Sequence, residues 1–320
     1  MFSTATAVRV TGPTPFSANC LAVPAGATTY TNAEVEPHLA INPSNPNHLV
    51  AAWQQDRLSD GGARGLVTAV SVDGGTTWSR PQASPFTQCA GNSYARASDP
   101  WVAVSDSAVL QIGIAFSGSA STAGARSTVL VSRSGDGGTT WAPAIPLVDD
   151  DGSRYFHDKE SLTIDSTDPR YVYALWDRVD PSDSGPTLLA RSTDGGVSWS
   201  PAVSIYDPGI GRQTIGNVAV TTPDGVVHVF FTELGKVRQV EAVQGLAQHR
   251  HANEATAIHG HEGERLGRHE LSRQAQIPFV FAVFIIYDHD ETAAPVSRNR
   301  VRNTGEAHGS STLFRSFSHD

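Results

Sequence analysis

Arginines and carboxylates recur at matching places along this sequence. The arginines are Arg57, Arg96, Arg178 and Arg212, and the carboxylates are Glu36, Asp56, Asp99, Asp158, Glu160 and Asp177. A guanidinium group can hold a carboxylate through two parallel hydrogen bonds, and a carboxylic acid can give a proton to a leaving group. Together these residue types suit a site for an anionic ligand, if the fold brings them to one surface. Salt bridges and turn caps are the structural alternative for each residue.

The composition limits the class of protein. Of 320 residues, 17% are charged, 29 are Gly and 19 are Pro, whereas charged residues usually make up about 25% of a chain. The sequence is therefore rich in turns, while six Trp, twelve Phe and seven Tyr provide an apolar core. A formal net charge of -9 disfavours a general nucleic-acid binder, so we expect no nucleic-acid partner.

The charged residues follow an internal repeat of about sixty residues. Three segments are nearly identical, namely SVDGGTTW at 71–78, SGDGGTTW at 134–141 and STDGGVSW at 192–199. Upstream of each lies a short alternating segment, at 36–42, 99–105 and 159–165, and a fourth follows at 217–221. Both features give the same period, which indicates a repeat architecture.

Each repeat is expected to form four short strands. In the first repeat these are predicted at 39–42, 49–55, 65–72 and 76–79, where β-branched and aromatic residues lie between Gly, Pro, Asn and Asp turns. A four-stranded unit stacked on copies of itself predicts an all-β protein, a β-propeller. The DGG segments lack the alternating carboxylates and terminal Glu of a calcium loop.

The three near-identical segments resemble the Asp-box, or bacterial neuraminidase repeat, of the sialidase superfamily. The resemblance covers about residues 36–236 and implies a propeller that has six blades in the family. It also implies that each box lies between the third and fourth strands, where its Asp accepts backbone hydrogen bonds and its Trp packs between blades. The residues given these structural roles are Asp73, Trp78, Asp136, Trp141, Asp194 and Trp199. Sortilin-type receptors and assembly factors share the box, so it indicates a blade more strongly than an activity.

The strand order predicts the face that binds a ligand. Because strands in a blade are antiparallel, the starts of first strands and the ends of second strands share one face, opposite the Asp-boxes. The four arginines and six carboxylates named in the first paragraph all fall on that face. We expect Arg57, Arg96, Arg178 and Arg212 to bind substrate, with Asp99, Asp158 and Glu160 as catalytic candidates.

The resemblance implies a glycoside hydrolase acting on terminal sialic acid or a related acidic sugar, without cofactor or metal. Family members use a Tyr–Glu nucleophile pair, an Asp acid/base and three Arg that hold the substrate carboxylate. The aromatic-Arg-Ile-Pro segment that carries the first Arg is absent here, and the Tyr and the later Arg residues have no match. Nothing singles out Tyr155 as the nucleophile. A non-catalytic propeller that binds a glycan or a protein therefore stays open as the alternative.

The two cysteines and the apolar segments bear on location. Cys20 and Cys89 are either joined as one disulfide or free, and the sequence decides neither. The N-terminus has no recognisable signal peptide, and the longest apolar run, 277–287, is shorter than the ~20 residues that cross a bilayer. We expect no membrane span, and the resemblance implies an extracellular or secreted protein.

The repeat signals stop near residue 238. We expect an N-terminal segment at 1–35, blades at about 36–98, 99–157 and 158–214, and a partial blade at 215–238. The tail at 239–320 is expected to be out of frame or otherwise unrelated to the propeller, or else to close a four-bladed ring with 279–287 as a late strand. Its histidines fit no strong zinc pattern, so no metal site is expected at His249, His251, His259 and His261.

Overall fold

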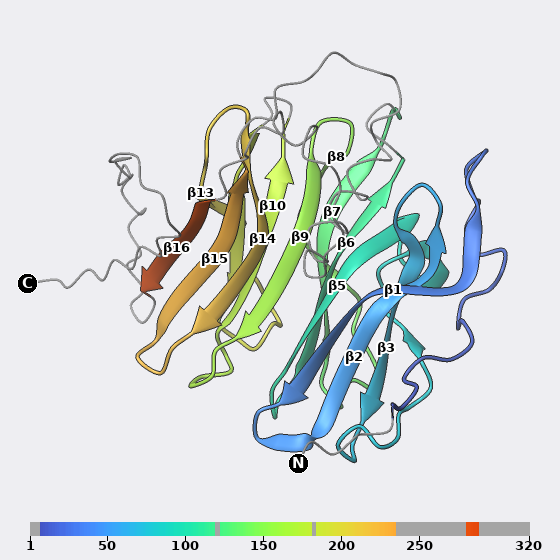
Figure 1. Ribbon diagram of the computed structural model, residues 1–320, viewed down its shortest axis with the longest axis horizontal. Coiled ribbons are helices and arrows are strands. Elements are labelled where there is room, and N and C mark those ends of the chain that lie inside the picture. The colour runs from blue at the N-terminus through green and yellow to red at the C-terminus, as the bar shows by residue number, and fades with distance from the viewer. Residues whose placement is uncertain (1–6, 119–121, 181–183, 235–279, 288–320) are drawn as a thin grey trace, which may run out of the picture.

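The computed structural model describes residues 7–118, 122–180, 184–234 and 280–287. Within these residues the chain consists of β-strands and one 3-10 helix, η1 (Gln88–Ala90), which confirms the all-β prediction. The strands fall into four blades that lie side by side, from the blue and green N-terminal blades to the orange one (Figure 1). No described segment is an apolar helix of membrane-spanning length.

Each blade is a group of hydrogen-bonded neighbouring strands. Blade 1 contains β1 (Thr29–Asn42), β2 (Asn45–Leu58), β3 (Ala63–Ser71) and β4 (Gln82–Ala83). Blade 2 contains β5 (Arg96–Val104), β6 (Val109–Ser117), β7 (Arg126–Ser134) and β8 (Ile145–Asp151). Blade 3 contains β9 (Phe156–Ile164), β10 (Val172–Val179), β12 (Thr187–Ser192) and β13 (Val203–Tyr206). Blade 4 contains β14 (Arg212–Thr221), β15 (Val226–Leu234), β16 (Val280–Tyr287) and the short β11 (Ser184–Gly185), which is parallel to β14.

The first strands of the blades line the inside of the array. β1, β5, β9 and β14 contact one another in chain order, as the inner strands of a propeller do. They begin two to seven residues before the blade boundaries expected at 36, 99, 158 and 215. Within a blade, neighbouring strands pair antiparallel apart from β11 and β14. The starts of the inner strands therefore share one end of the array, which we call the open face.

The fourth strand of blade 1 lies further along the chain than the sequence suggested. The strand predicted at 76–79 is wrong, because these residues form a turn and β4 follows it. The Asp73 carboxylate accepts hydrogen bonds from the backbone N–H and the hydroxyl of Thr77. The Trp78 indole donates back to the Gly75 carbonyl at 3.1 Å. These local bonds fold the segment onto the turn, and the Ser79 N–H donates to the Val70 carbonyl of β3 at 2.8 Å before β4 begins.

Part of the predicted tail forms a strand. The late strand considered at 279–287 is present as β16, which pairs antiparallel with β15 along its whole length. The rest of the predicted tail, including the histidines named above, lies outside the described residues.

One β-bulge recurs on all four inner strands. The pairing register of each inner strand with its neighbour shifts at the bulge. The residues with left-handed backbone there are Glu36, Asp99, Lys159 and Gly216, with φ of 53°, 52°, 50° and 71°. Non-glycine residues rarely adopt this conformation, and a bulge re-aims the side chains of its strand. Each blade therefore presents its equivalent residue at the same level of the array.

Apolar side chains fill the junctions between blades. Ile112 of β6 and Trp176 of β10 are fully buried in the core between blades 2 and 3. The Asp-box tryptophans contribute to these junctions: Trp141 packs on the core between blades 1 and 2, and Trp199 on the core between blades 2 and 3. Burying one such large side chain stabilises the fold by about 1.5–3 kcal/mol.

The N-terminal segment covers the outer side of blade 1. Phe16 packs with Trp53 and Trp78, and a disulfide joins Cys20 to Cys89, whose Cα atoms are 4.9 Å apart. Of the two states that the sequence left open, the structure therefore has the bridged one.

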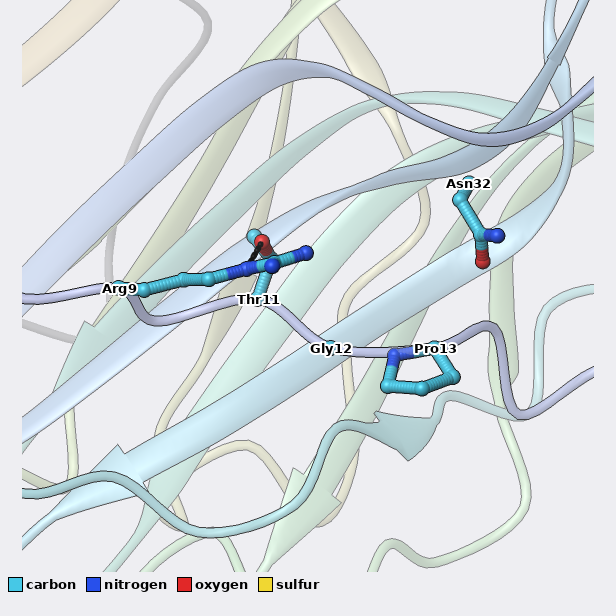
Figure 2. Close-up of a pocket in the computed structure, with 5 residues that line it drawn as sticks. All are labelled: Arg9, Thr11, Gly12, Pro13 and Asn32. Atoms are coloured by element: carbon cyan, nitrogen blue, oxygen red, sulfur yellow. Dashed lines mark hydrogen bonds between the residues drawn. The ribbon is translucent and has the colours of Figure 1, made fainter.

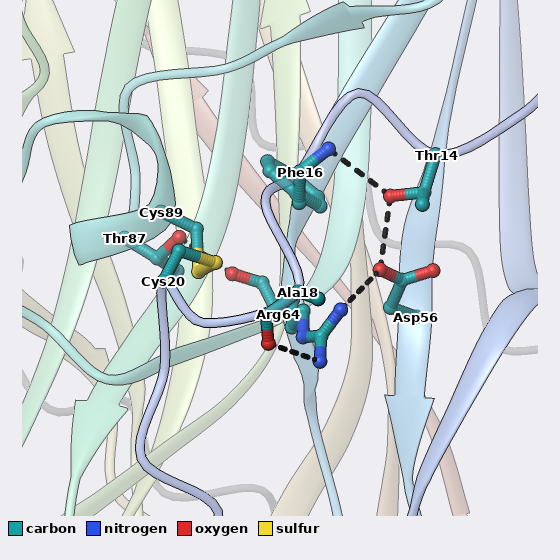
Figure 3. The surroundings of a disulfide bond; sticks show 8 residues. All are labelled: Thr14, Phe16, Ala18, Cys20, Asp56, Arg64, Thr87 and Cys89. Atoms are coloured by element: carbon teal, nitrogen blue, oxygen red, sulfur yellow. Dashed lines mark hydrogen bonds and ion pairs between the residues drawn. A yellow bond between two sulfur atoms is a disulfide. The ribbon is translucent and has the colours of Figure 1, made fainter.

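A buried ion pair between Arg64 and Asp56 also anchors the N-terminal segment (Figure 3). Arg64 Nη1 lies 3.2 Å from Asp56 Oδ2, and both side chains are less than a tenth exposed. The Thr14 hydroxyl donates to the same carboxylate at 2.9 Å, while Arg64 Nη2 donates to the Ala18 carbonyl. Asp56, expected on the ligand face, is instead committed to anchoring the N-terminal segment.

Candidate functional site

Three carboxylates and one ammonium group meet where the inner strands start. We call Glu36, Asp99, Asp158 and Lys159 the axial cluster. Lys159 Nζ donates to Asp99 Oδ2 at 2.9 Å, and its backbone N–H donates to Asp158 at 3.1 Å. Hydrogen bonds join Asp99 to both Glu36 and Asp158. The recurrent bulge thus brings together residues that lie about sixty positions apart in the sequence.

Polar neighbours complete the axial cluster on the side of blade 1. Gln54 donates to the Glu36 carboxylate and, at 2.8 Å, to the Ser98 hydroxyl. Ser98 in turn donates to Asp99. Arg57 Nη1 donates to Gln54 Oε1 at 2.9 Å, so its guanidinium group lies beside the exposed residue Glu36.

The axial cluster combines ionised and protonated carboxyl groups at neutral pH. Burial of the carboxyl group, with the nearby charge of Asp99, raises the pKa of Glu36 to about 7. The same two causes raise the pKa of Asp158 to about 7. Burial acts in the same direction on Asp99, but the Lys159 ammonium and hydrogen bonds from Glu36 and Ser98 lower its pKa below the usual value. A proton donor and an ionised carboxylate are therefore in contact.

Two further carboxyl groups lie beneath this layer. Glu160 is 4% exposed, and one of its oxygens accepts a hydrogen bond from the Ile114 N–H at 3.1 Å. Asp177 is fully buried, within 3.4 Å of the Asn217 amide. Burial raises the pKa of both groups well above the usual values and so favours their protonated forms. Glu160, expected among the catalytic candidates, is thus placed between blades and away from solvent.

The four predicted arginines have different surroundings. Arg96 makes a two-pronged contact with Asp60 at 2.8 and 3.0 Å and also donates to the Gly61 carbonyl. Its side chain is only 10% exposed. Arg212 is paired with Glu233, which also accepts the Tyr206 hydroxyl. These two arginines are satisfied by their own carboxylates and are not brought to the axial cluster.

Arg178 is the second arginine with room for a ligand. Its Nη1 atom is 3.6 Å from Asp150 Oδ2, and its side chain is 28% exposed. The guanidinium group stacks over the Tyr155 ring, 4.6 Å from the centroid. Arg178 also follows Asp177, the residue paired with Asp158 across β9 and β10. Arg57 therefore lies beside the axial cluster, whereas Arg178 faces Asp150 of blade 2.

Several residues of this face escaped the sequence reasoning. Lys159 occupies the repeat position of Glu36 and Asp99, so a comparison of the repeats could have found it. Asp60 and Asp150, which hold Arg96 and Arg178, lie at positions with no repeat signal. The contact between Tyr206 and Glu233 has the residue types of a Tyr–Glu pair, but burial and the Glu233 charge raise the pKa of Tyr206. That shift disfavours the phenolate form that a nucleophile requires.

The three DGG segments that resemble Asp-boxes lie at the opposite end of the blades, between β3 and β4, β7 and β8, and β12 and β13. Asp136 is representative: it accepts hydrogen bonds from the Thr140 N–H at 2.9 Å and from the Thr140 hydroxyl at 2.6 Å. Asp73 and Asp194 accept the equivalent bonds. The Trp141 indole reaches across the blade junction to the Thr68 hydroxyl at 3.0 Å.

Two hollows lie along the N-terminal segment. One, of about 320 Å³, is lined by Arg9, Thr11, Gly12, Pro13 and Asn32 (Figure 2). The other, of about 370 Å³, is mostly apolar and includes Trp53 and Trp78 in its wall. No residue of the axial cluster lines either hollow. The described residues contain no group of three or more His, Cys, Asp or Glu side chains arranged to hold a metal ion.

Comparison with known proteins identifies solved structures with a similar fold. No family model and no curated protein matches the chain. Among solved structures, the Hadza microbial sialidase Hz136 is 17% identical over 63% of this chain and 42% of its own, with a TM-score of 0.50. Trypanosoma rangeli sialidase in complex with the inhibitor DANA is 14% identical over 64% and 36%, with a TM-score of 0.44. Penicillium chrysogenum alpha-L-arabinanase complexed with arabinobiose is 15% identical over 65% and 63%, with a TM-score of 0.48.

These identities, coverages and TM-scores describe a partial match. The chain spans less than half the length of the two sialidases and 63% of the arabinanase. At such identities the likeness concerns the fold alone. The four blades, their inner strands and the placement of the turn segments agree with it. The chain therefore has the blade architecture of the sialidase-type β-propeller.

Proposed function

We propose that the open face binds a terminal acidic sugar, such as sialic acid, and that the chain acts as a sialidase-like glycoside hydrolase. The single observation that carries this proposal is the axial cluster, which gathers three carboxyl groups and the Lys159 ammonium group at the open face. Arg57 lies beside it and Arg178 lies on the same open face, and each guanidinium group can bind the carboxylate of such a sugar.

In this proposal the carboxyl groups divide the acid–base work. The Glu36 residue as a whole is exposed, but its carboxyl group is packed against Gln54. The raised pKa of that group keeps a proton available near neutral pH, as a general acid needs. Asp158 is the second acid, and it is less exposed. Asp99 stays ionised beside Lys159 and stabilises positive charge that develops on the sugar ring.

A non-catalytic sugar-binding propeller is the second candidate, favoured by a different observation. Asp99 hydrogen-bonds directly to Glu36 and to Asp158. The two carboxyl groups of a glycosidase are instead separated by about 5–9.5 Å, which leaves room for the sugar or for water. A face with arginines but without that separation can bind an acidic glycan and leave it intact.

We also propose a location for the protein and a boundary within its chain. The Cys20–Cys89 disulfide supports an extracellular or secreted location, because disulfides persist in oxidising compartments. The division into a propeller at 36–238 and a tail at 239–320 rests on the loss of the repeat, although β16 of blade 4 lies within that tail. Sequencing the source DNA across codons 230–245 tests the tail: an intact frame, with no related sequence in another frame, contradicts an out-of-frame origin.

A fluorogenic sialoside assay and a glycan-binding assay on the same protein separate the candidates. Arg57→Ala, Glu36→Gln and Asp99→Ala are compared with Arg170→Ala, which changes an exposed arginine in the turn between β9 and β10. Turnover that the first three changes abolish and the control leaves intact supports the hydrolase. Binding without turnover supports the sugar-binding module. Neither binding nor turnover of any acidic sugar overturns both.

A further inference from the structure

A line of polar contacts runs from the core of blade 3 to the open face. The Trp176 indole Nε1 donates to His157 Nδ1 at 3.1 Å. On the other side of the ring, His157 Nε2 is 3.2 Å from Asp150 Oδ2. The same oxygen is 3.6 Å from Arg178 Nη1. Three buried or half-buried side chains therefore separate the guanidinium group from the interior of the protein.

The chemistry of this line fixes the position of one proton. An indole N–H can only donate a hydrogen bond, so His157 Nδ1 must be the acceptor and cannot carry a proton. The His157 side chain is fully buried, and that burial lowers its pKa despite the neighbouring Asp150. The neutral ring therefore carries its proton on Nε2, which lies 3.2 Å from Asp150 Oδ2 although the two atoms do not meet hydrogen-bond geometry. An N–H group fixed this close to a carboxylate favours one orientation of that carboxylate.

The strand pairing explains why these residues meet. Arg178 lies directly opposite His157 in the ladder between β9 and β10, while Trp176 faces the bulge on β9. Asp150 comes from β8 of the neighbouring blade, and the His157 N–H donates to the Ser127 hydroxyl of β7 at 3.1 Å. The line thus crosses from blade 3 to blade 2 and depends on the packing of both.

Arg178 itself has capacity left for a ligand. The Tyr155 ring supports one face of the guanidinium group, and Asp150 is its charged partner. The side chain is 28% exposed, while its Nε atom is buried without a hydrogen-bond partner. A guanidinium group carries five N–H donors. Next to it Phe156, 43% exposed, pairs with Val179 and offers an apolar surface to a sugar ring.

We propose that His157 is a positioning residue, which holds Arg178 through Asp150 so that the guanidinium group binds the carboxylate of an acidic sugar. The inference rests on the proposed function for its ligand, and on the observed contacts alone for the positioning. His157 never touches the sugar in this arrangement. Its role is to keep Asp150 from rotating, so that Arg178 is presented in one orientation.

The test removes the Trp176 indole N–H donor and keeps an aromatic ring in the core of blade 3. Trp176→Phe preserves an aromatic ring but deletes the N–H, and His157→Gln alters the next link. Trp199→Phe is the matched control, because the Trp199 indole N–H has no hydrogen-bond partner to lose. NMR of the imidazole nitrogens reports the His157 tautomer, and the Arg178 Nε–H signal, assigned with Arg178→Lys, reports guanidinium mobility.

We expect a single Nε2–H tautomer and an ordered Arg178 signal in the wild type and in Trp199→Phe. In Trp176→Phe we expect both His157 tautomers and an Arg178 Nε–H signal that reports a mobile guanidinium group. In His157→Gln we expect the same change in the Arg178 signal. Titration with N-acetylneuraminic acid should then show an affinity lower by about two- to tenfold, the effect of one ordinary hydrogen bond. An unchanged tautomer in Trp176→Phe, or an Arg178 signal as ordered as in the control, overturns the inference.

The two proposals can fail separately. If the wild type binds no acidic sugar, the proposed function fails, and the positioning role is still decided by the tautomer and the Arg178 signal. If the wild type binds and both variants bind equally well with ordered Arg178, the positioning role fails and the proposed function stands.

Discussion

Lys159 Nζ donates to Asp99 Oδ2 at 2.9 Å across the junction of blades 2 and 3. The two residues occupy the same bulge position of their respective blades, with φ of 50° and 52°. A repeat that places equivalent residues at one level would bring like charges together if every blade kept the same side chain. Blades 1 and 2 have the acidic residues Glu36 and Asp99 at this position, whereas blade 3 has Lys159. The positive charge of Lys159 therefore compensates the negative charges of the first two blades.

Replacing Lys159 by methionine should destabilise the protein at pH 7. The change leaves Asp99 without its cation, and the Lys159 side chain is 28% exposed, so we expect a loss of about 1–3 kcal/mol, between the values for surface and buried pairs. Urea unfolding measures it. Arg170→Ala, which removes an exposed pair with Asp168, should cost at most about 1 kcal/mol. Equal losses in the two variants would contradict a special role for Lys159.

The raised pKa values of Glu36 and Asp158 predict a stability that falls as the pH rises from about 4 to 7. In the unfolded chain both groups ionise near pH 4, whereas in the folded protein they keep their protons up to about pH 7. The folded state thus binds more protons in this interval, and the half-buried Asp158 lowers the stability by at most about 1.4 kcal/mol per pH unit. The exposed Glu36 lowers it by less, because solvent screens its interactions. Urea unfolding at pH 5, 6, 7 and 8 measures the slope. Glu36→Gln and Asp158→Asn should each flatten it, and slopes equal to that of the wild type contradict the assignment.

The sequence sufficed to predict the blades because their determinants are local and repeated. The DGG turns and alternating segments recur at one period, and antiparallel pairing then places Glu36, Asp99 and Asp158 on one face. The fourth strand of blade 1 was misplaced because the hydrogen bonds of Asp73 hold the next four residues in the turn, and a β-like composition does not reveal that competition.

Side-chain partners in the site were less accessible to sequence reasoning. A bulge shifts the alternation of a strand, so the consecutive half-buried residues Asp158 and Lys159, followed by the buried Glu160, do not follow from a simple in–out pattern. The pairing of Arg96 with Asp60 depends on the path of the loop between β2 and β3. Such a path is fixed by tertiary contacts, and no spacing in the sequence encodes it.

Removing the disulfide should weaken the protein and release its N-terminal segment. Cys20 and Cys89 are 69 residues apart, and opening a loop of that size costs about 2–5 kcal/mol. The double variant Cys20→Ser, Cys89→Ser should show this loss in urea, and wild type in reducing buffer should match it. Faster proteolysis near Phe16, which packs on Trp53, should accompany the loss. A double variant as stable as the wild type would contradict the prediction.

The lowered pKa values of the Asp-box carboxylates predict a stability that falls as the pH is lowered, which is opposite to the effect of Glu36 and Asp158. Hydrogen bonds from Thr140 and Ser134 lower the pKa of Asp136 to about 2, so its contribution is present above the ordinary value near 4 and is lost as the pH falls toward 2. Asp136→Asn should therefore lower Tm at pH 7, and the difference from the wild type should shrink in acid. Asp106→Asn, at an exposed position of the turn between β5 and β6, is the control. A difference in Tm that is constant from pH 7 to pH 3 contradicts this account.

Two arginines of the open face should give opposite phenotypes. Arg96 is nearly buried and held by Asp60 and Gly61, so Arg96→Ala should lower the free energy of unfolding by about 1–3 kcal/mol and leave sugar affinity nearly unchanged. Arg178 is more exposed and has N–H groups to spare. Arg178→Ala should weaken binding of N-acetylneuraminic acid by roughly 10- to 100-fold, the effect of losing hydrogen bonds to a charged group, with little change in stability. Calorimetric titration and urea unfolding of both variants separate the two roles. If Arg96→Ala loses affinity while Arg178→Ala retains it, the ligand lies over blades 1 and 2, and the arrangement around Arg178 serves blade packing alone.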